Sequence, residues 1–192
     1  MENLMYFVRY VDGEEGKMAQ METLETRVPV NIHLEEGSDF DLEEDTLCSV
    51  DLSADRTDLS FYDDEEAFNN AKTGMAPQSM IPCGTFSLHD DPDFQPSPFI
   101  FFAGKIPIMQ YREKVRNPDE PNFRFFVESF ELNFWLYCNL PSDLKTTDEE
   151  GDEVSKDKDN SVSLQNGMIA EGTAWLYGTV KSTEIEPDDT EQ

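Results

Sequence analysis

The residues that could carry acid–base or nucleophilic chemistry form no recognisable catalytic set in this sequence. Two histidines are present, His33 and His89, and His33 stands in the alternating segment VPVNIHL, which is typical of a surface or half-buried strand residue. Neither histidine follows a nucleophile motif, and the sequence has no G-x-S-x-G elbow, no phosphate-binding loop and no G-x-G-x-x-G. Carboxylates are so abundant that chance pairs are expected, so pairing assigns no acid–base role. The sequence therefore predicts a protein that is not an enzyme and carries no cofactor.

Two segments of the sequence are rich in oxygen ligands that could bind a metal ion. HDDPDF places three aspartates directly after His89, and such clusters can hold calcium or magnesium, but the ligand spacing of an EF-hand is missing. DKDNSVSLQNGM begins like a calcium loop at Asp157, yet Val162 and Met168 stand where that loop needs glycine and glutamate. We therefore expect a solvated turn in the first segment and no metal in either.

The cysteines and the N-terminus suggest a reducing compartment. Cys48, Cys83 and Cys138 are odd in number and far apart, whereas a disulfide framework or a zinc site favours paired spacing. The segment MENLMYFVRYVDG has no basic lead-in and no long apolar region, so we expect no secretory signal. These features predict three free thiols in a cytoplasmic protein with no membrane segment.

Charge limits the class of partner. The 192 residues include 42 acids and 14 bases, for a net charge of −28. A field of that sign repels nucleic acid phosphates and anionic lipid and attracts basic molecules. The charge can also serve solubility alone. A basic protein partner is the binding hypothesis that the charge favours, and nucleic acid is disfavoured.

One aromatic window departs from this acidity. Residues 98–140 carry five acids and five bases, and they hold 11 of the 22 aromatic residues. This composition indicates the core of a C-terminal unit. Five bases fall within 20 residues of the window: Lys105, Arg112, Lys114, Arg116 and Arg124.

The first 75 residues are expected to form short strands and one helix. DDEEAFNNAKTG has Asp63 or Asp64 as a cap, acids in its first turn and Gly74 as a stop signal, which together predict a helix. Residues 76–97 are rich in proline and predict an ordered connector. The strands predicted by apolar alternation are Leu4–Val11, Arg27–Leu34, Leu47–Leu52 and Asp58–Tyr62.

The second half reads as a meander of strands. PFIFFAGKIPIMQYREKV predicts a long strand that is broken or bulged near Gly104 and Pro107. FRFFVE predicts a second strand, and Ser129–Phe130 a tight turn or a bulge. ELNFWLYCN alternates, so Leu132 and Phe134 should share one face while Trp135 and Tyr137 share the other. Polar residues 143–165 and 184–192 are expected to be the most mobile. No internal repeat is visible in the sequence.

The closing segment NGMIAEGTAWLYGTVKS carries Gly167, Gly172 and Gly178 inside a strand pattern. Glycine permits the sharp coiling and close backbone approach that small barrels need. We expect at least one of these glycines to have positive φ, to sit in a bulge, or to contact another element's backbone. Ala170 and Leu176 should share the glycines' face.

These features resemble an OB-fold barrel over about Pro98 to Lys181. The resemblance rests on Gly104 in the first strand and on the glycines around Ala174-Trp175-Leu176. An unrelated β-sandwich with ordinary turn glycines is the alternative. IPCGTFS, FFAGKI and GTAWLYG also resemble a bacterial domain family, which implies no particular chemistry.

The expected fold is thus mainly β: a curved antiparallel sheet or OB-like barrel with one short helix. We divide the chain into an acidic β-rich region 1–75, a connector 76–97, a barrel 98–182 and an acidic tail 183–192, with 1–75 and 98–182 as one domain in the alternative. The favoured function is a non-enzymatic protein that binds a basic partner protein. The other is an OB-type module that binds an oligonucleotide or oligosaccharide. The OB resemblance implies a ligand face made by Arg112, Lys114, Arg116, Arg124, Phe126, Trp135 and Tyr137, whereas these aromatic rings could instead pack on the N-terminal half.

Overall fold

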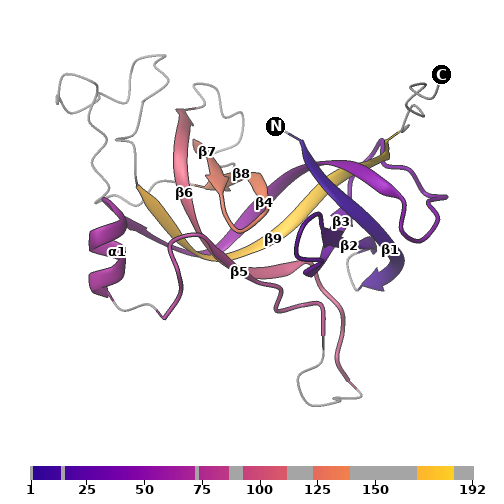
Figure 1. The fold of residues 1–192 in the computed structure, drawn as a ribbon, viewed down its shortest axis with the longest axis horizontal. Coiled ribbons are helices and arrows are strands. Elements are labelled where there is room, and N and C mark those ends of the chain that lie inside the picture. Colours follow the sequence, from indigo (N-terminus) through magenta and orange to yellow (C-terminus); the bar gives the residue numbers. More distant parts are fainter. Residues whose placement is uncertain are drawn as a thin grey trace, which may run out of the picture.

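The computed structural model describes residues 2–13, 16–71, 74–86, 93–111, 123–138 and 168–183. This part of the chain is mainly β with one short helix, as the sequence predicted (Figure 1). Four predicted features lie wholly or partly outside the described residues: the segments 143–165 and 184–192, Gly167, and His89 to Pro92 of HDDPDF. The elements are β1 (Asn3–Gly13), β2 (Gly16–Thr23), β3 (Pro29–Leu34), β4 (Leu47–Tyr62), α1 (Glu65–Ala71), β5 (Ser79–Ile81), β6 (Phe99–Tyr111), β7 (Phe123–Glu128), β8 (Asn133–Cys138) and β9 (Ile169–Ser182).

Two long antiparallel strands, β4 and β9, form the centre of the sheet. Their pairing runs from Cys48↔Ser182 to Tyr62↔Ile169, with one bulge between Arg56 and Asp58. Figure 1 shows them crossing the molecule together, with β1–β3 toward one end and β6–β8 toward the other. The sequence predicted two separate strands in place of β4, and the bulge lies where the prediction left a gap.

The pairings close two rings of five strands. In the first ring β1, β2 and β3 form a meander, β3 pairs in parallel with β9, β9 pairs with β4, and β4 returns to β1. In the second ring β6, β7 and β8 form a meander, β8 pairs in parallel with β4, β4 pairs with β9, and β9 returns to β6. The sheet is therefore mixed, since both meanders join the central pair through a parallel pairing.

The two rings repeat one connection pattern, which the sequence did not reveal. In each ring a three-stranded meander is followed along the chain by a long strand, which is β4 after β1–β3 and β9 after β6–β8. The last strand of each meander pairs in parallel with the long strand that follows the other meander. The repetition lies in the strand pairing and not in the amino-acid sequence. A repeated pairing order leaves no trace in a single sequence when the side chains differ.

This interlocking changes the expected domain layout. Strands β6–β9 do not close a ring without β4, which belongs to the first 75 residues, and β1–β3 do not close one without β9. The ring that contains the strands of 98–182 therefore also includes β4. Buried side chains from both rings form one continuous core, so the single-domain alternative fits these pairings.

The connector between the halves packs on β3. Asn31 is 2% exposed. Its Nδ2 donates hydrogen bonds to the carbonyl oxygens of Gly84 (3.0 Å) and Ser97 (3.2 Å). The short strand β5 lies in the same connector and pairs with β6. These hydrogen bonds and the β5–β6 pairing hold the described part of 76–97 in place, which is consistent with the ordered connector predicted from the sequence.

The glycines of β9 provide room for β4, as expected. Ala170, Gly172, Leu176 and Gly178 all face the buried side. A side chain at Gly172 would collide with the carbonyl oxygen of Asp58, and one at Gly178 would lie 2.9 Å from the carbonyl oxygen of Asp51. The expected close backbone approach is confirmed, without positive φ at either glycine.

The predicted helix is confirmed as α1. Asp64 caps it, because its Oδ1 accepts a hydrogen bond of 2.7 Å from the backbone N–H of Ala67. Phe68 is buried and packs edge-on against Tyr62 at the end of β4, with ring centroids 5.1 Å apart. Gly74 follows the helix with φ +85°, a conformation that glycine adopts readily.

Candidate functional site

Outward-facing side chains meet at the middle of the sheet, where β8, β4 and β9 lie side by side. Along β4, Leu52 and Ala54 are buried in the core, whereas the alternating residues Asp51, Ser53 and Asp55 face outward. The small Ser53 pairs with Trp135 on β8 and with Tyr177 on β9. A small side chain between two large ones leaves a depression over β4.

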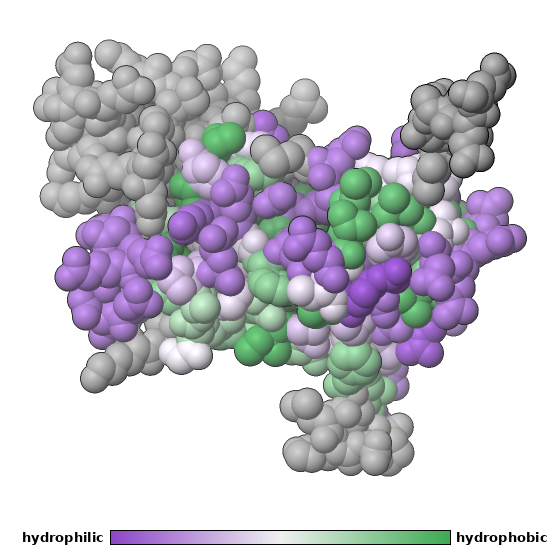
Figure 2. Space-filling model, in the orientation of Figure 1, coloured by the Kyte–Doolittle hydropathy of each residue, from purple (hydrophilic) through white to green (hydrophobic). Residues whose placement is uncertain are grey.

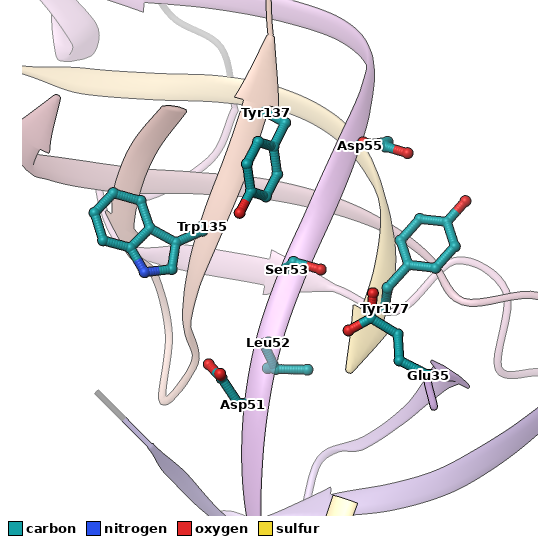
Figure 3. A pocket seen from close by; sticks show the side chains of 8 residues that line it. All are labelled: Glu35, Asp51, Leu52, Ser53, Asp55, Trp135, Tyr137 and Tyr177. Carbon is teal, nitrogen blue, oxygen red and sulfur yellow. The ribbon is translucent and has the colours of Figure 1, made fainter. Parts of the chain in front are cut away.

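This depression is a cavity of about 480 Å³, which we call the acidic groove. In Figure 3, Trp135 and Tyr137 lie on one side of β4, and Tyr177 and Glu35 lie on the other. Its volume falls in the range of about 300–1,000 Å³ that is usual for ligand pockets. The groove is lined by Glu35, Asp51, Leu52, Ser53, Asp55, Trp135, Tyr137 and Tyr177.

Three carboxylates give the groove its charge. Within the described part of the chain, none of Glu35, Asp51 and Asp55 forms a salt bridge. Partial burial raises the pKa of Asp55, because it disfavours the charged carboxylate. A cation entering the groove would therefore meet carboxylates with no ion-pair partner among the described residues, beside aromatic rings.

Four of the seven residues predicted to form a ligand face do come together. Arg124 pairs with Tyr137 and Phe126 pairs with Trp135 across β7 and β8. The Arg124 guanidinium carbon lies 4.4 Å from the Trp135 ring centroid, and the rings of Phe126 and Trp135 are 5.3 Å apart. Phe126 is 3% exposed, and its ring packs edge-on against that of Trp135. Arg112, Lys114 and Arg116 lie outside the described residues.

The sequence prediction missed the acidic half of this site. Trp135 and Tyr137 line the groove, but Asp51, Ser53, Asp55, Tyr177 and Glu35 were not singled out. The alternation of Asp51-Leu-Ser-Ala-Asp55 was a local signal for acids on one strand face. Their position beside Trp135 depends on the parallel β4–β8 pairing, which joins distant parts of the chain.

Cys48, Cys83 and His33 are not among the residues that line the groove. Cys48 is buried, and desolvation raises the pKa of its thiol to about 11, so it resists ionisation. Cys83 is exposed, and neither of these two cysteines is in a disulfide. The His33 ring lies edge-on to Tyr177, with centroids 5.4 Å apart. Among the described residues there is no group of three or more potential metal ligands.

The visible surface agrees with the acidic composition. Figure 2 shows hydrophilic residues covering the α1 end of the molecule and much of the face toward the viewer, with hydrophobic residues in smaller areas between them. Exposed Glu65 and Glu66 contribute on the helix. No helix in the described ranges has the length and apolar character needed to cross a membrane.

Comparison of the chain with protein-family models, with curated proteins and with solved structures found no match.

Proposed function

We propose that this is a non-enzymatic cytoplasmic protein that binds a basic partner protein. The observation that carries the proposal is the acidic groove, in which three carboxylates without described salt bridges stand beside three aromatic side chains. The net charge of −28 adds a long-range attraction for the same class of partner. The exposed free thiol of Cys83 is compatible with a reducing compartment.

The two features would act at different stages of binding. The overall field raises the rate of encounter with a basic surface more than it raises affinity, and salt weakens it. The groove acts after contact, because a cation over an aromatic ring gains about 0.5–2 kcal/mol and a carboxylate in a partly desolvated site adds to this. Long-range electrostatic attraction and binding in the groove would together select a basic partner, and neither requires a catalytic residue.

Titration with a hexa-arginine peptide tests the proposal against a neutral hexaglutamine peptide of equal length. The protein should bind the cationic peptide and leave the neutral one unbound, with affinity falling as salt is raised from 50 to 300 mM. Equal affinity for the two peptides, or absence of binding to both at low salt, would contradict the proposal.

A second function follows from the contacts that Trp135 makes with β7. The Arg124 guanidinium stacks on that ring and Phe126 supports it, which is an arrangement suited to stacking a base or a sugar. The order of strands in each ring also resembles that of an OB-fold, which binds oligonucleotides and oligosaccharides on the face of its second and third strands and with adjoining loops. A ten-nucleotide single-stranded DNA and a linear hexasaccharide are the probes. Binding that Arg124→Gln abolishes and exposed Lys181→Gln preserves would favour this function over the first.

A further inference from the structure

We propose that the acidic groove seats an extended segment of the partner, with an arginine side chain over Ser53 and basic side chains two residues away on either side. This inference rests on the proposed function and specifies its ligand. It assigns the groove a partner segment of the form Arg-x-Arg-x-Arg, in which the three arginines point to the same face.

The width of the groove fits one guanidinium. Trp135 and Tyr177 are the two cross-strand neighbours of Ser53. Adjacent strands lie about 4.8 Å apart, so the backbones that carry the two rings are about 10 Å apart. In Figure 3 the Trp135 ring points away from β4, whereas Tyr137 and Tyr177 lie nearer to β4 on its two sides. A planar cation over Ser53 makes a cation–π contact with a ring whose centroid lies within about 6 Å of it. Ser53 is small enough to leave that space open.

The length of the groove sets the spacing of the cations. Asp51 and Asp55 lie on the same face of β4, four residues apart, which corresponds to about 13 Å. An extended partner segment has the same repeat, so residues i and i+4 reach both aspartates while residue i+2 lies over Ser53. Consecutive arginines would point to alternate faces and could not do so.

Arginine is favoured over lysine because the molecule already holds an arginine in a comparable setting. The Arg27 guanidinium carbon lies 3.5 Å from the Tyr6 ring centroid, and Nη1 lies 3.1 Å from Glu22 Oε2 and 3.3 Å from Asp45 Oδ1. A planar guanidinium can stack on a ring and donate to two carboxylates at once, whereas an ammonium acts as a point charge. The groove also places aromatic rings beside carboxylates, spread over the positions that three basic side chains of an extended segment would reach.

Two peptides of identical composition test the spacing. TRTRTRT places its arginines on one face of an extended chain, whereas TTRRRTT places them on alternate faces. Calorimetric titration should show at least tenfold tighter binding of TRTRTRT. Ser53→Trp should fill the groove and weaken this binding at least tenfold, while Ser60→Trp, at an exposed position further along β4, should leave it unchanged.

A measurement on the unaltered protein covers the case in which Ser53→Trp does not fold. Titration of TRTRTRT into isotopically labelled protein should shift the amide resonances of Ser53 and Asp55 and the indole N–H of Trp135. Equal affinities for the two peptides, or full affinity of a folded Ser53→Trp variant, would overturn the inference while leaving electrostatic binding of basic ligands intact. Failure of every cationic peptide to bind would overturn the proposed function itself.

Discussion

The side chain of Asn3 forms two hydrogen bonds with the backbone of Asn133, one as donor and one as acceptor. Asn3 Nδ2 donates to the carbonyl oxygen of Asn133 at 2.8 Å, and the Asn133 N–H donates to Asn3 Oδ1 at 2.7 Å. The same Nδ2 lies 3.2 Å from the carbonyl oxygen of Val50. These contacts join the first residue of β1, in the first ring, to the first residue of β8, in the second ring. Both strands pair with β4.

Asn3→Ala should therefore destabilise the whole molecule. Asn3 is 4% exposed, so its removal leaves the Asn133 backbone groups without their partner in a buried setting. We expect a loss of about 2–4 kcal/mol in the free energy of unfolding, measured by urea titration. Exposed Asn69→Ala on α1 is the control. A loss no larger than that of the control would contradict the bridging role.

Gly172→Ala should destabilise more than Gly178→Ala. The added methyl at Gly172 meets the backbone of β4 at Asp58, which cannot move without disturbing the bulge, whereas at Gly178 two of the three nearest atoms belong to the side chains of Leu52 and Ile32. Crowding of this kind costs about 1–3 kcal/mol. Thermal unfolding of the two variants gives the order, and equal melting temperatures would refute the close approach at Gly172.

Glu131→Gln should weaken the contact between two turns. Glu131 Oε2 accepts hydrogen bonds from the backbone N–H groups of Glu25 (3.0 Å) and Thr26 (3.3 Å). Burial alone would raise its pKa, but these bonds, with those from the side chains of Thr26 and Thr23, hold the pKa below the ordinary value. The stabilisation is present above the glutamate pKa of the unfolded chain and is lost as the pH falls through the lower, folded-state pKa.

The wild-type protein should thus exceed Glu131→Gln in melting temperature at pH 7, and the difference should vanish in acid. Exposed Glu44→Gln serves as the comparison. A difference that persists unchanged at pH 2 would show that the carboxylate charge is not responsible.

Asp55→Asn should stabilise the protein while it weakens binding of a basic ligand. Desolvation raises the folded-state pKa of Asp55, so its charged form opposes folding above that pKa, and this cost disappears as the pH falls through it. The variant should melt higher than wild type at pH 7 and match it in acid. A lower melting temperature at pH 7 would show that Asp55 is held by favourable contacts instead.

Local pattern predicted the elements and faces but not their assembly. Leu132, Phe134 and Leu136 are buried while Trp135 and Tyr137 face outward, as period-two alternation requires. β2 was missed because Met18, Ala19, Gln20 and Met21 are buried in succession, which hides the alternation. A strand covered on both faces has no half-buried pattern to read.

The pairing that closes the two rings could not be predicted from the sequence, for a different reason. β9 pairs with β3, β4 and β6, and the choice among such distant partners depends on the core that all of them build together. The same limit applied to the site, because Trp135 meets Ser53 only through the β4–β8 pairing. The OB-like resemblance and the ligand face that it implies stay predictions.

The most direct test of the account is the affinity of TRTRTRT for two variants that each lose two negative charges. Asp51→Asn with Asp55→Asn alters the acidic groove, whereas Glu43→Gln with Glu44→Gln removes the same charge from exposed positions outside it. If the groove seats a basic segment, the first variant should bind at least tenfold more weakly than wild type and the second within twofold of it. Equal weakening of the two variants would mean that net charge alone attracts the peptide, and it would contradict the groove as the binding site.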